Sequence, residues 1–176
     1  LQELSSIEES LIPDPHFIGG GLHELKPGGY LKIHSDYCFH SETKLDRRLN
    51  MLIYLNKNWE EEYDGHLELW DSNMSYCGQK ILPIFNRVVI FNTNDISFHG
   101  NPTKVKCPSS MSRKSIALYY FSNGRPKEEI RPILFQQSTF FKQRPGEKFK
   151  FNIRYILLNL SKELMPPIFY RVAKKV

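Results

Sequence analysis

The sequence lacks long hydrophobic runs and paired cysteines, and each shortage narrows the class of protein. The longest apolar stretches, such as "RVVIF" and "YILLNL", are far too short to span a bilayer, and we recognise no cleavable leader. The three cysteines, Cys38, Cys77 and Cys107, include no C-x-x-C pair, so neither a disulfide framework nor a thiolate zinc site is indicated. We therefore expect a protein of the reducing cytoplasm.

Charge is distributed unevenly along the 176 residues. Residues 1–124 contain 12 Lys and Arg against 15 Asp and Glu, a balance of −3, whereas residues 125–176 contain 12 against 4, a balance of +8. We predict a basic C-terminal extension over 125–176 with one helix at 149–164, whose apolar residues form one stripe. The extension either caps the fold or docks an acidic partner or an anionic membrane. Nucleic acid is not favoured, because no stacking aromatics alternate with the charges.

Residues 19–124 show the pattern of a mainly β domain. Short apolar runs alternate with turn residues, and we expect strands near 21–25, 29–36, 47–56, 66–71, 79–84, 87–92, 96–99 and 113–122. Closely spaced strands with little helical pattern between them predict an antiparallel sandwich or jelly roll. Residues 1–18 are predicted to be an N-terminal helix and entry segment, since apolar residues recur at near-helical spacing over 1–11 before "IPDP".

Two polar side chains interrupt the predicted strand in "YLKIHSDYCFH". Because successive side chains on a strand alternate between its faces, His34 and Asp36 share one face, and Leu31 and Ile33 the other. An imidazole and a carboxylate together suit a divalent transition metal. His99 in "ISFHG", at the predicted end of a strand and before a glycine turn, is the candidate third ligand. Two histidines and one carboxylate would form the facial triad of non-haem iron(II) oxygenases.

A second pair has the same spacing and competes with the first. His66 and Glu68 in "DGHLELWD" are also separated by one residue. A lone H-x-D or H-x-E in a strand is a weak signal for a metal, so the choice between the two pairs depends on the rest of the chain.

An arginine follows the third candidate ligand in "SRKSIALYYF". The same alternation places Arg113, Ser115, Ala117 and Tyr119 on one face, while Lys114 points away. An arginine directed into a sandwich is costly to bury unless it meets an anion, and its planar fork pairs well with a carboxylate. Arg113 and Ser115 are therefore predicted to hold the far end of a dicarboxylic acid.

Six segments, in this order, resemble one known family. They are the H-x-D pair, "LNMLIYLNKNW", "DGHLELWD", "PIFNRVVIF", "SFHG" and "RKSIALYYF". Over 19–124 they resemble the iron(II)- and 2-oxoglutarate-dependent oxygenases, in the prolyl-4-hydroxylase-like branch. The resemblance implies a double-stranded β-helix, which is a jelly roll, with flanking helices. It also implies iron(II) as the metal of His34, Asp36 and His99, with 2-oxoglutarate and dioxygen as cosubstrates and ascorbate as a further candidate.

The resemblance assigns further residues to the cosubstrate. Arg113, assisted by Ser115, would anchor the distal carboxylate of 2-oxoglutarate. Tyr54 of "YLN" matches a tyrosine that often lines the cosubstrate pocket, and Leu67 would pack against the cosubstrate chain, although core filling is the alternative for both. The loop 37–47 would lie over the site, as an ordinary surface loop or as a mobile lid.

The implied function is hydroxylation of an unactivated C–H bond with release of succinate and carbon dioxide. A prolyl residue of a protein is the favoured substrate, and a free amino acid, a sugar or a lipid-linked molecule are the alternatives. Arginine stands where collagen-type enzymes use lysine, which leaves the substrate open. A jelly-roll zinc hydrolase or metal-binding module is the other class to consider, since zinc accepts the same ligands. Such a protein would not need Arg113 and Ser115 facing inward.

Overall fold

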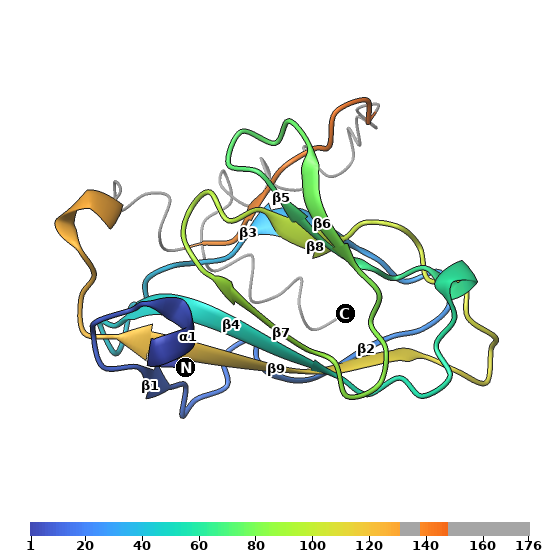
Figure 1. Cartoon of the computed structure of the whole chain (residues 1–176), viewed down its shortest axis with the longest axis horizontal. Helices are drawn as coiled ribbons and strands as arrows, with labels where there is room; N and C mark the ends of the chain where they lie inside the picture. The colour runs from blue at the N-terminus through green and yellow to red at the C-terminus, as the bar shows by residue number, and fades with distance from the viewer. Residues whose placement is uncertain (131–137, 148–176) are drawn as a thin grey trace, which may run out of the picture. The chain divides into compact units, whose positions relative to one another are not determined.

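The structure, a computed structural model, describes residues 1–130 and 138–147 (Figure 1). Its strands belong to one compact unit, Leu1–Pro145. They are β1 (Ile12–Pro13), β2 (Gly21–Leu25), β3 (Leu31–Ser35), β4 (Asp46–Tyr54), β5 (Leu67–Trp70), β6 (Cys77–Ile81), β7 (Val88–Asn92), β8 (His99–Asn101), β9 (Arg113–Ser122) and β10 (Phe140–Phe141). The described helices are α1 (Gln2–Ser5) and the 3₁₀ turns η1 (Glu61–Tyr63) and η2 (Lys127–Glu129). None of these is long and apolar enough to cross a membrane.

Two antiparallel sheets form the two layers of the fold (Figure 1). In sheet A the strand order is β1-β9-β4-β7, and β2 also pairs with β9; in sheet B the order is β10-β3-β8-β5-β6. Between β2 and β9 the chain passes repeatedly from one sheet to the other, so that most consecutive strands lie in different layers. This alternation is typical of a jelly roll. The predicted fold class is therefore confirmed, although the described helices that flank the sheets are short.

Apolar side chains fill part of the space between the sheets. Tyr54 of β4, Leu67 of β5 and Val89 of β7 form one buried cluster, against which Leu52 and Phe91 pack. Full burial of such side chains stabilises a fold by about 1.5–3 kcal/mol each. Leu52, Leu67 and Phe91 also line a cavity, so the apolar core of the sandwich borders directly on that cavity.

Most predicted strands are confirmed with small shifts at their ends, but one is misplaced. The strand predicted at 96–99 is wrong, because β8 begins at His99 and Gly100 lies inside it rather than in a turn. A Cβ on Gly100 would lie 2.7 Å from the carbonyl oxygen of Lys32 and 2.9 Å from that of Leu31. Strand β8 approaches β3 so closely that only glycine fits at this position.

The predicted N-terminal helix over 1–11 is wrong in length. Helix α1 ends at Ser5, and Ser6 follows with a left-handed backbone conformation, φ 56°. From Ile12 the chain joins sheet A, since Ile12 lies opposite Phe121 in the β1–β9 pair. Pairing with β9 thus replaces continued helix at this end of the chain.

The predicted extension begins at residue 125, and part of it joins sheet B. Strand β10 pairs antiparallel with β3, with Phe140 opposite Ser35 and Phe141 opposite His34. The helix predicted at 149–164 lies outside the described residues. The sandwich therefore includes a strand that the sequence pattern did not indicate.

Candidate metal and cosubstrate site

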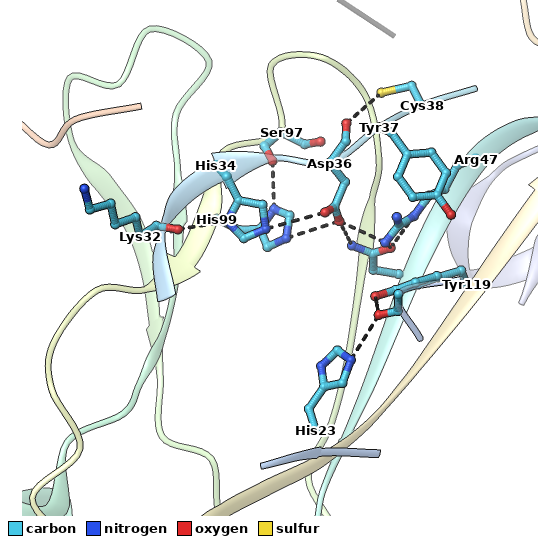
Figure 2. A network of polar contacts seen from close by, with 12 residues as sticks. His23, Lys32, His34, Asp36, Tyr37, Cys38, Arg47, Ser97, His99 and Tyr119 are labelled. Carbon is cyan, nitrogen blue, oxygen red and sulfur yellow. Dashed lines mark hydrogen bonds and ion pairs between the residues drawn. The ribbon is translucent and has the colours of Figure 1, made fainter. Parts of the chain in front are cut away.

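Three side chains with metal-binding groups meet at the junction of β3 and β8 (Figure 2). His34 lies on β3, Asp36 follows that strand, and His99 lies opposite His34 at the start of β8. Nε2 of His34 lies 3.5 Å from Oδ1 of Asp36, and Nε2 of His99 lies 3.4 Å from Oδ2. Within residues 1–130 and 138–147, no other group of three His, Cys, Asp or Glu residues brings its ligand atoms within 4.8 Å of one another.

Backbone carbonyls orient both imidazoles. Nδ1 of His34 lies 2.8 Å from the carbonyl oxygen of Lys32, and Nδ1 of His99 lies 3.0 Å from that of Ser97. A carbonyl oxygen only accepts hydrogen bonds, so each Nδ1 carries a proton and each Nε2 is left to face Asp36. In a neutral imidazole with its proton on Nδ1, the lone pair lies on Nε2, which is then the atom that can bind a metal ion. The three residues therefore fit a divalent metal ion, and the carbonyl partners are the outer support that such ligands usually have.

Two further side chains hold Asp36. Nη2 of Arg47 donates a hydrogen bond to Oδ2 of Asp36 at 2.9 Å, and Nδ2 of Asn50 donates to the same oxygen at 2.7 Å. Burial alone would raise the pKa of Asp36, but the imidazoles of His34 and His99 and the guanidinium of Arg47 hold the pKa of this carboxyl well below its usual range. The ionised carboxylate supplies the negative charge of the triad.

Arg47 is fixed on several sides. Its Nε and Nη2 donate to Oδ1 of Asn50 at 3.0 and 2.6 Å. Its guanidinium carbon lies 3.4 Å from the ring centroid of Tyr119 and 4.8 Å from that of Tyr37, and the side chain is 1% exposed. The planar guanidinium between two rings and an amide has little freedom to turn. Arg47 is therefore a fixed hydrogen-bond donor that holds Asp36 in position.

Arg47 and Asn50 were not predicted from the sequence. Residues three apart on a regular strand point to opposite faces. The register of β4 against β9 shifts between Arg47 and Leu49, and such a bulge brings Arg47 to the side of Asn50. The available signal was the arginine pair in "DRRLN" at a strand start, but alternation alone could not link it to Asp36.

Arg113 lies buried on the inner face of β9, as predicted. Its Nε donates to the carbonyl oxygen of Gly65 at 2.6 Å, and its Nη2 lies 3.4 Å from the hydroxyl of Tyr54. Burial lowers the pKa of Arg113, while Tyr54 opposes that shift. No carboxylate of the described residues forms an ion pair with Arg113. A buried guanidinium without a charged partner is costly, so this position fits the carboxylate of a ligand.

Gly65 leaves the space that Arg113 occupies. A Cβ at Gly65 would lie 3.0 Å from Cδ of Arg113 and 3.1 Å from Val105, and the backbone of Gly65 has φ +73°. A larger residue would both strain the backbone and push the arginine away. The glycine of "DGHLEL" thus has a specific role in placing the predicted anchor.

The triad and the anchor line one cavity of about 80 Å³. The predicted alternation along β9 is confirmed, because Arg113, Ser115, Ala117 and Tyr119 all line this cavity whereas Lys114 is exposed. Leu67 lines it as well. Tyr54 is fully buried in the apolar cluster and contacts the anchor through its hydroxyl and through its ring, whose centroid lies 5.0 Å from the guanidinium carbon of Arg113. The assigned roles of Ser115, Tyr54 and Leu67 toward a cosubstrate stay predictions.

The predicted grouping of Leu31 with Ile33 is wrong. Leu31 lines the cavity together with His34, whereas Ile33 packs with Met74 and Phe98 in a separate cluster. The register of β3 against β8 shifts between Leu31 and His34. A bulge of this kind changes the face on which the residues before it lie.

The competing H-x-E pair does not converge. Nε2 of His66 lies 2.8 Å from Glu61, and Glu68 accepts a hydrogen bond from Nε1 of Trp70 at 2.9 Å. Glu68 also lies 3.5 Å from Arg144. The two side chains have separate partners, and neither lines the cavity.

The loop 37–47 is a hydrogen-bonded hairpin. The N–H of His40 donates to the carbonyl oxygen of Leu45, and that of Arg47 donates to Cys38, at 2.9 and 2.8 Å. Cys38 and His40 are buried. Backbone bonds thus close the loop on itself, and the ordinary surface loop and the mobile lid both stay predictions.

Fold and site together define a jelly-roll protein with a facial metal triad and an anion anchor in the same cavity. The chain belongs to the 2OG-Fe(II) oxygenase superfamily, whose family model matches residues 20–121. The predicted family is therefore confirmed. Membership implies iron(II), 2-oxoglutarate and dioxygen, and the triad offers the matching ligands for iron.

Several proteins are similar to this chain. Prolyl 3-hydroxylase OGFOD1 of Mus musculus is 26% identical over 99 residues, which are 53% of this chain and 18% of that protein. The chain thus spans about a fifth of the length of this curated relative. Among solved structures, a prolyl 4-hydroxylase from Phytophthora capsici is 24% identical over 57% of this chain and 31% of its own, with a TM-score of 0.44. A prolyl hydroxylase from Trichoplax adhaerens, in complex with a hypoxia inducible factor peptide fragment, is 24% identical over 57% and 42%, with a TM-score of 0.46.

Proposed function

We propose that this protein is an iron(II)- and 2-oxoglutarate-dependent dioxygenase that hydroxylates an unactivated C–H bond. The favoured substrate is a prolyl residue of a protein, and succinate and carbon dioxide are the co-products. The observation that most supports this proposal is the shared cavity, lined at once by the triad and by the buried Arg113. The name of the mouse relative, a prolyl 3-hydroxylase, supports the substrate class.

The residues of the cavity would hold two groups. His34, Asp36 and His99 would bind iron(II) through two imidazole nitrogens and one carboxylate oxygen, and Arg113 with Ser115 would bind the distal carboxylate of 2-oxoglutarate. When bound, iron(II) and 2-oxoglutarate would, together with dioxygen, supply the oxidising chemistry, in which one oxygen atom enters the substrate and the other enters succinate. The protein's own contribution is to bind, orient and exclude water.

Orientation comes from the supporting contacts. The carbonyl bonds to Nδ1 fix the orientation of both imidazoles, so that each Nε2 faces the metal position. Arg47 and Asn50 hold Asp36 ionised and in place. Phe91, whose ring centroid lies 4.7 Å from that of His99, adds an apolar wall that limits access of water to the reacting groups.

The zinc hydrolase is the less favoured alternative. Two histidines and an aspartate also suit catalytic zinc, but a hydrolase has no use for a guanidinium buried in the same cavity without a protein carboxylate. Arg113 therefore supports a site that binds 2-oxoglutarate rather than a hydrolytic zinc site.

The test is succinate formation from 2-oxoglutarate by the purified full chain with added iron(II). We expect turnover in air, loss of turnover under nitrogen, and loss when zinc(II) replaces iron(II). Hydrolysis of an ester or amide with zinc and no succinate with iron(II) would favour the alternative function instead.

For the basic extension we propose docking to an acidic partner or an anionic membrane, with the protein in the cytoplasm. Residues 148–176 contain seven Lys and Arg and one Glu, and each basic side chain near an anionic leaflet contributes about 1 kcal/mol. A chain that ends at Glu147 keeps β10 and is the matched control. Salt-sensitive sedimentation with phosphatidylserine vesicles should require residues 148–176, and equal sedimentation of both chains contradicts docking through this segment.

A further inference from the structure

Strand β10 covers the free edge of the strand that bears His34. Phe141 lies opposite His34 in the pair, and the backbone N–H of Lys142 donates to the carbonyl oxygen of Ile33 at 2.9 Å. β10 thereby becomes the outer strand of sheet B. It lies beyond residues 20–121, which the family model matches.

The side chains of this segment divide between the two faces of sheet B. Residues directly opposite in an antiparallel pair point the same way, so Phe141 shares the inner face with His34, and their ring centroids lie 5.6 Å apart. Phe140 and Lys142 point to the outer face, where Nζ of Lys142 lies 5.6 Å from the ring centroid of Phe98 and 6.0 Å from that of Phe140. Of the three consecutive residues, only Phe141 lies beside the triad.

Phe141 keeps an accessible aromatic surface. It is 55% exposed, whereas the His34 that it contacts is 5% exposed. A substrate that approaches the triad along this edge meets the ring before it meets the metal ligands. Apolar groups pack well on the face of an aromatic ring, whose electron-rich surface attracts C–H edges.

We propose that Phe141 is a substrate-contacting residue, whose ring is a wall beside the triad for the apolar ring of a prolyl substrate. The proposal rests on the proposed function and adds to it the residue that selects the substrate. The pyrrolidine ring presents C–H groups to such a wall, and packing there would hold the reacting carbon toward the metal ligands. An alanyl residue at the same place would leave most of the wall uncovered.

The test uses the full chain with iron(II), 2-oxoglutarate and two peptide pools. One pool holds randomised pentapeptides with proline at the centre, and the matched pool holds alanine there. The readout is succinate formation with each pool divided by the rate of the same variant without peptide. The wild type should give a higher value with the proline pool than with the alanine pool, and the ratio of these two values measures the preference for proline. Phe141→Ala should lower that ratio about tenfold, as removal of a central interface aromatic does, while Phe141→Trp should largely keep it.

Three neighbouring variants locate the effect. Phe140→Ala and Lys142→Ala should keep the wild-type ratio, because both side chains face away from the triad. Lys142→Pro removes the N–H that pairs with Ile33. It should detach β10 and lower the ratio as Phe141→Ala does, although Phe141 is still present.

Each other outcome has a definite meaning. An unchanged ratio in Phe141→Ala, or an equal loss in Phe140→Ala, overturns the proposal, and so does a wild type that forms succinate but ignores the proline pool. A wild type without any succinate formation contradicts the proposed function. In that case, binding of the two pools to the manganese(II)-loaded protein tests the role of Phe141. If the wild type prefers the proline pool and Phe141→Ala abolishes this preference, the proposal is supported. If the wild type shows no preference, the proposal is overturned.

Discussion

Two H-x-acid pairs lie at the ends of strands of sheet B, and only one of them meets a third ligand. His34 and Asp36 have their side chains in the cavity with His99 opposite. His66 and Glu68 flank Leu67, and it is Leu67 that lines the cavity. In a strand with period two, the neighbours of an inward residue point outward.

The difference between the pairs shows that the H-x-acid spacing identifies a candidate metal site, but that the face of the sheet to which the side chains point decides whether the site forms. Glu68 and His66 are as buried as the triad, at 7% and 4% exposed, so burial does not separate the pairs. Their partners do: the outward pair is paired with Trp70, Arg144 and Glu61. The inward pair, His34 and Asp36, instead directs its ligand atoms toward one point, where Nε2 of His99 also lies. The predictions below test that distinction.

The largest effect is expected from the triad. His34→Ala, Asp36→Ala or His99→Ala should abolish metal binding and 2-oxoglutarate turnover, because two ligands do not hold a facial site. Isothermal titration with manganese(II) and the succinate assay measure both. In the wild type, metal at one hundred times its Kd should raise the free energy of unfolding by about 2.7 kcal/mol.

The matched controls are His66→Ala and Glu68→Ala. Both should keep metal binding, since neither side chain lines the cavity. Loss of turnover in His66→Ala with turnover kept in His34→Ala would reverse the assignment of the two pairs.

The second effect concerns the other side of the cavity. Arg113→Ala should raise the concentration of 2-oxoglutarate needed for half-maximal turnover by roughly two to four decades, since loss of one partner of a buried charge pair costs about 3–5 kcal/mol. Lys114→Ala should change it little, because that side chain is exposed. Equal effects of the two substitutions would contradict the alternation along β9.

The third effect concerns the support of Asp36. Arg47→Leu should weaken manganese(II) binding by about 10–100-fold, the usual loss when an outer partner of a metal ligand is removed. Arg48→Leu is the control, because Arg48 contacts Glu9 and Ser122 instead of Asp36. If Arg48→Leu weakens metal binding as much, the effect reflects general destabilisation of β4 and not the position of Asp36.

The smallest effect is expected from the outward pair. Glu68→Gln keeps an acceptor for Nε1 of Trp70 and loses only the charge that faces Arg144. Ion pairs with a partly exposed partner contribute about 0–1 kcal/mol, so thermal unfolding should change little and metal affinity not at all. A fall in metal affinity would place Glu68 in the site and break the comparison.

Several parts of the site could be predicted from local pattern. Alternation along "SRKSIALYYF" put Arg113 and Ser115 on the inner face because β9 is regular over its length. The spacing of His34 and Asp36 puts two ligand atoms on one side by the same rule. Both predictions rest on the geometry of a single strand and needed no knowledge of its neighbours.

Other parts depend on pairing between distant strands. The bulges of β3 and β4 shift Leu31 and Arg47 to faces that alternation does not predict. A bulge arises where two strands fit each other with one residue in excess, so a single strand does not reveal it. The same holds for Gly100, whose necessity comes from the carbonyls of β3 beside it.

The sequence by itself determined the class of fold, the candidate ligands and the candidate anchor, because period-two patterns and residue chemistry are local. Only the tertiary structure decided which H-x-acid pair faces inward, that Arg47 and Asn50 hold Asp36, and that Phe141 lies beside His34. Each of these depends on strand register, and a shift of one residue exchanges the two faces of a strand. Register is set by contacts between segments far apart in the chain, such as β10 and β3, which are more than 100 residues apart.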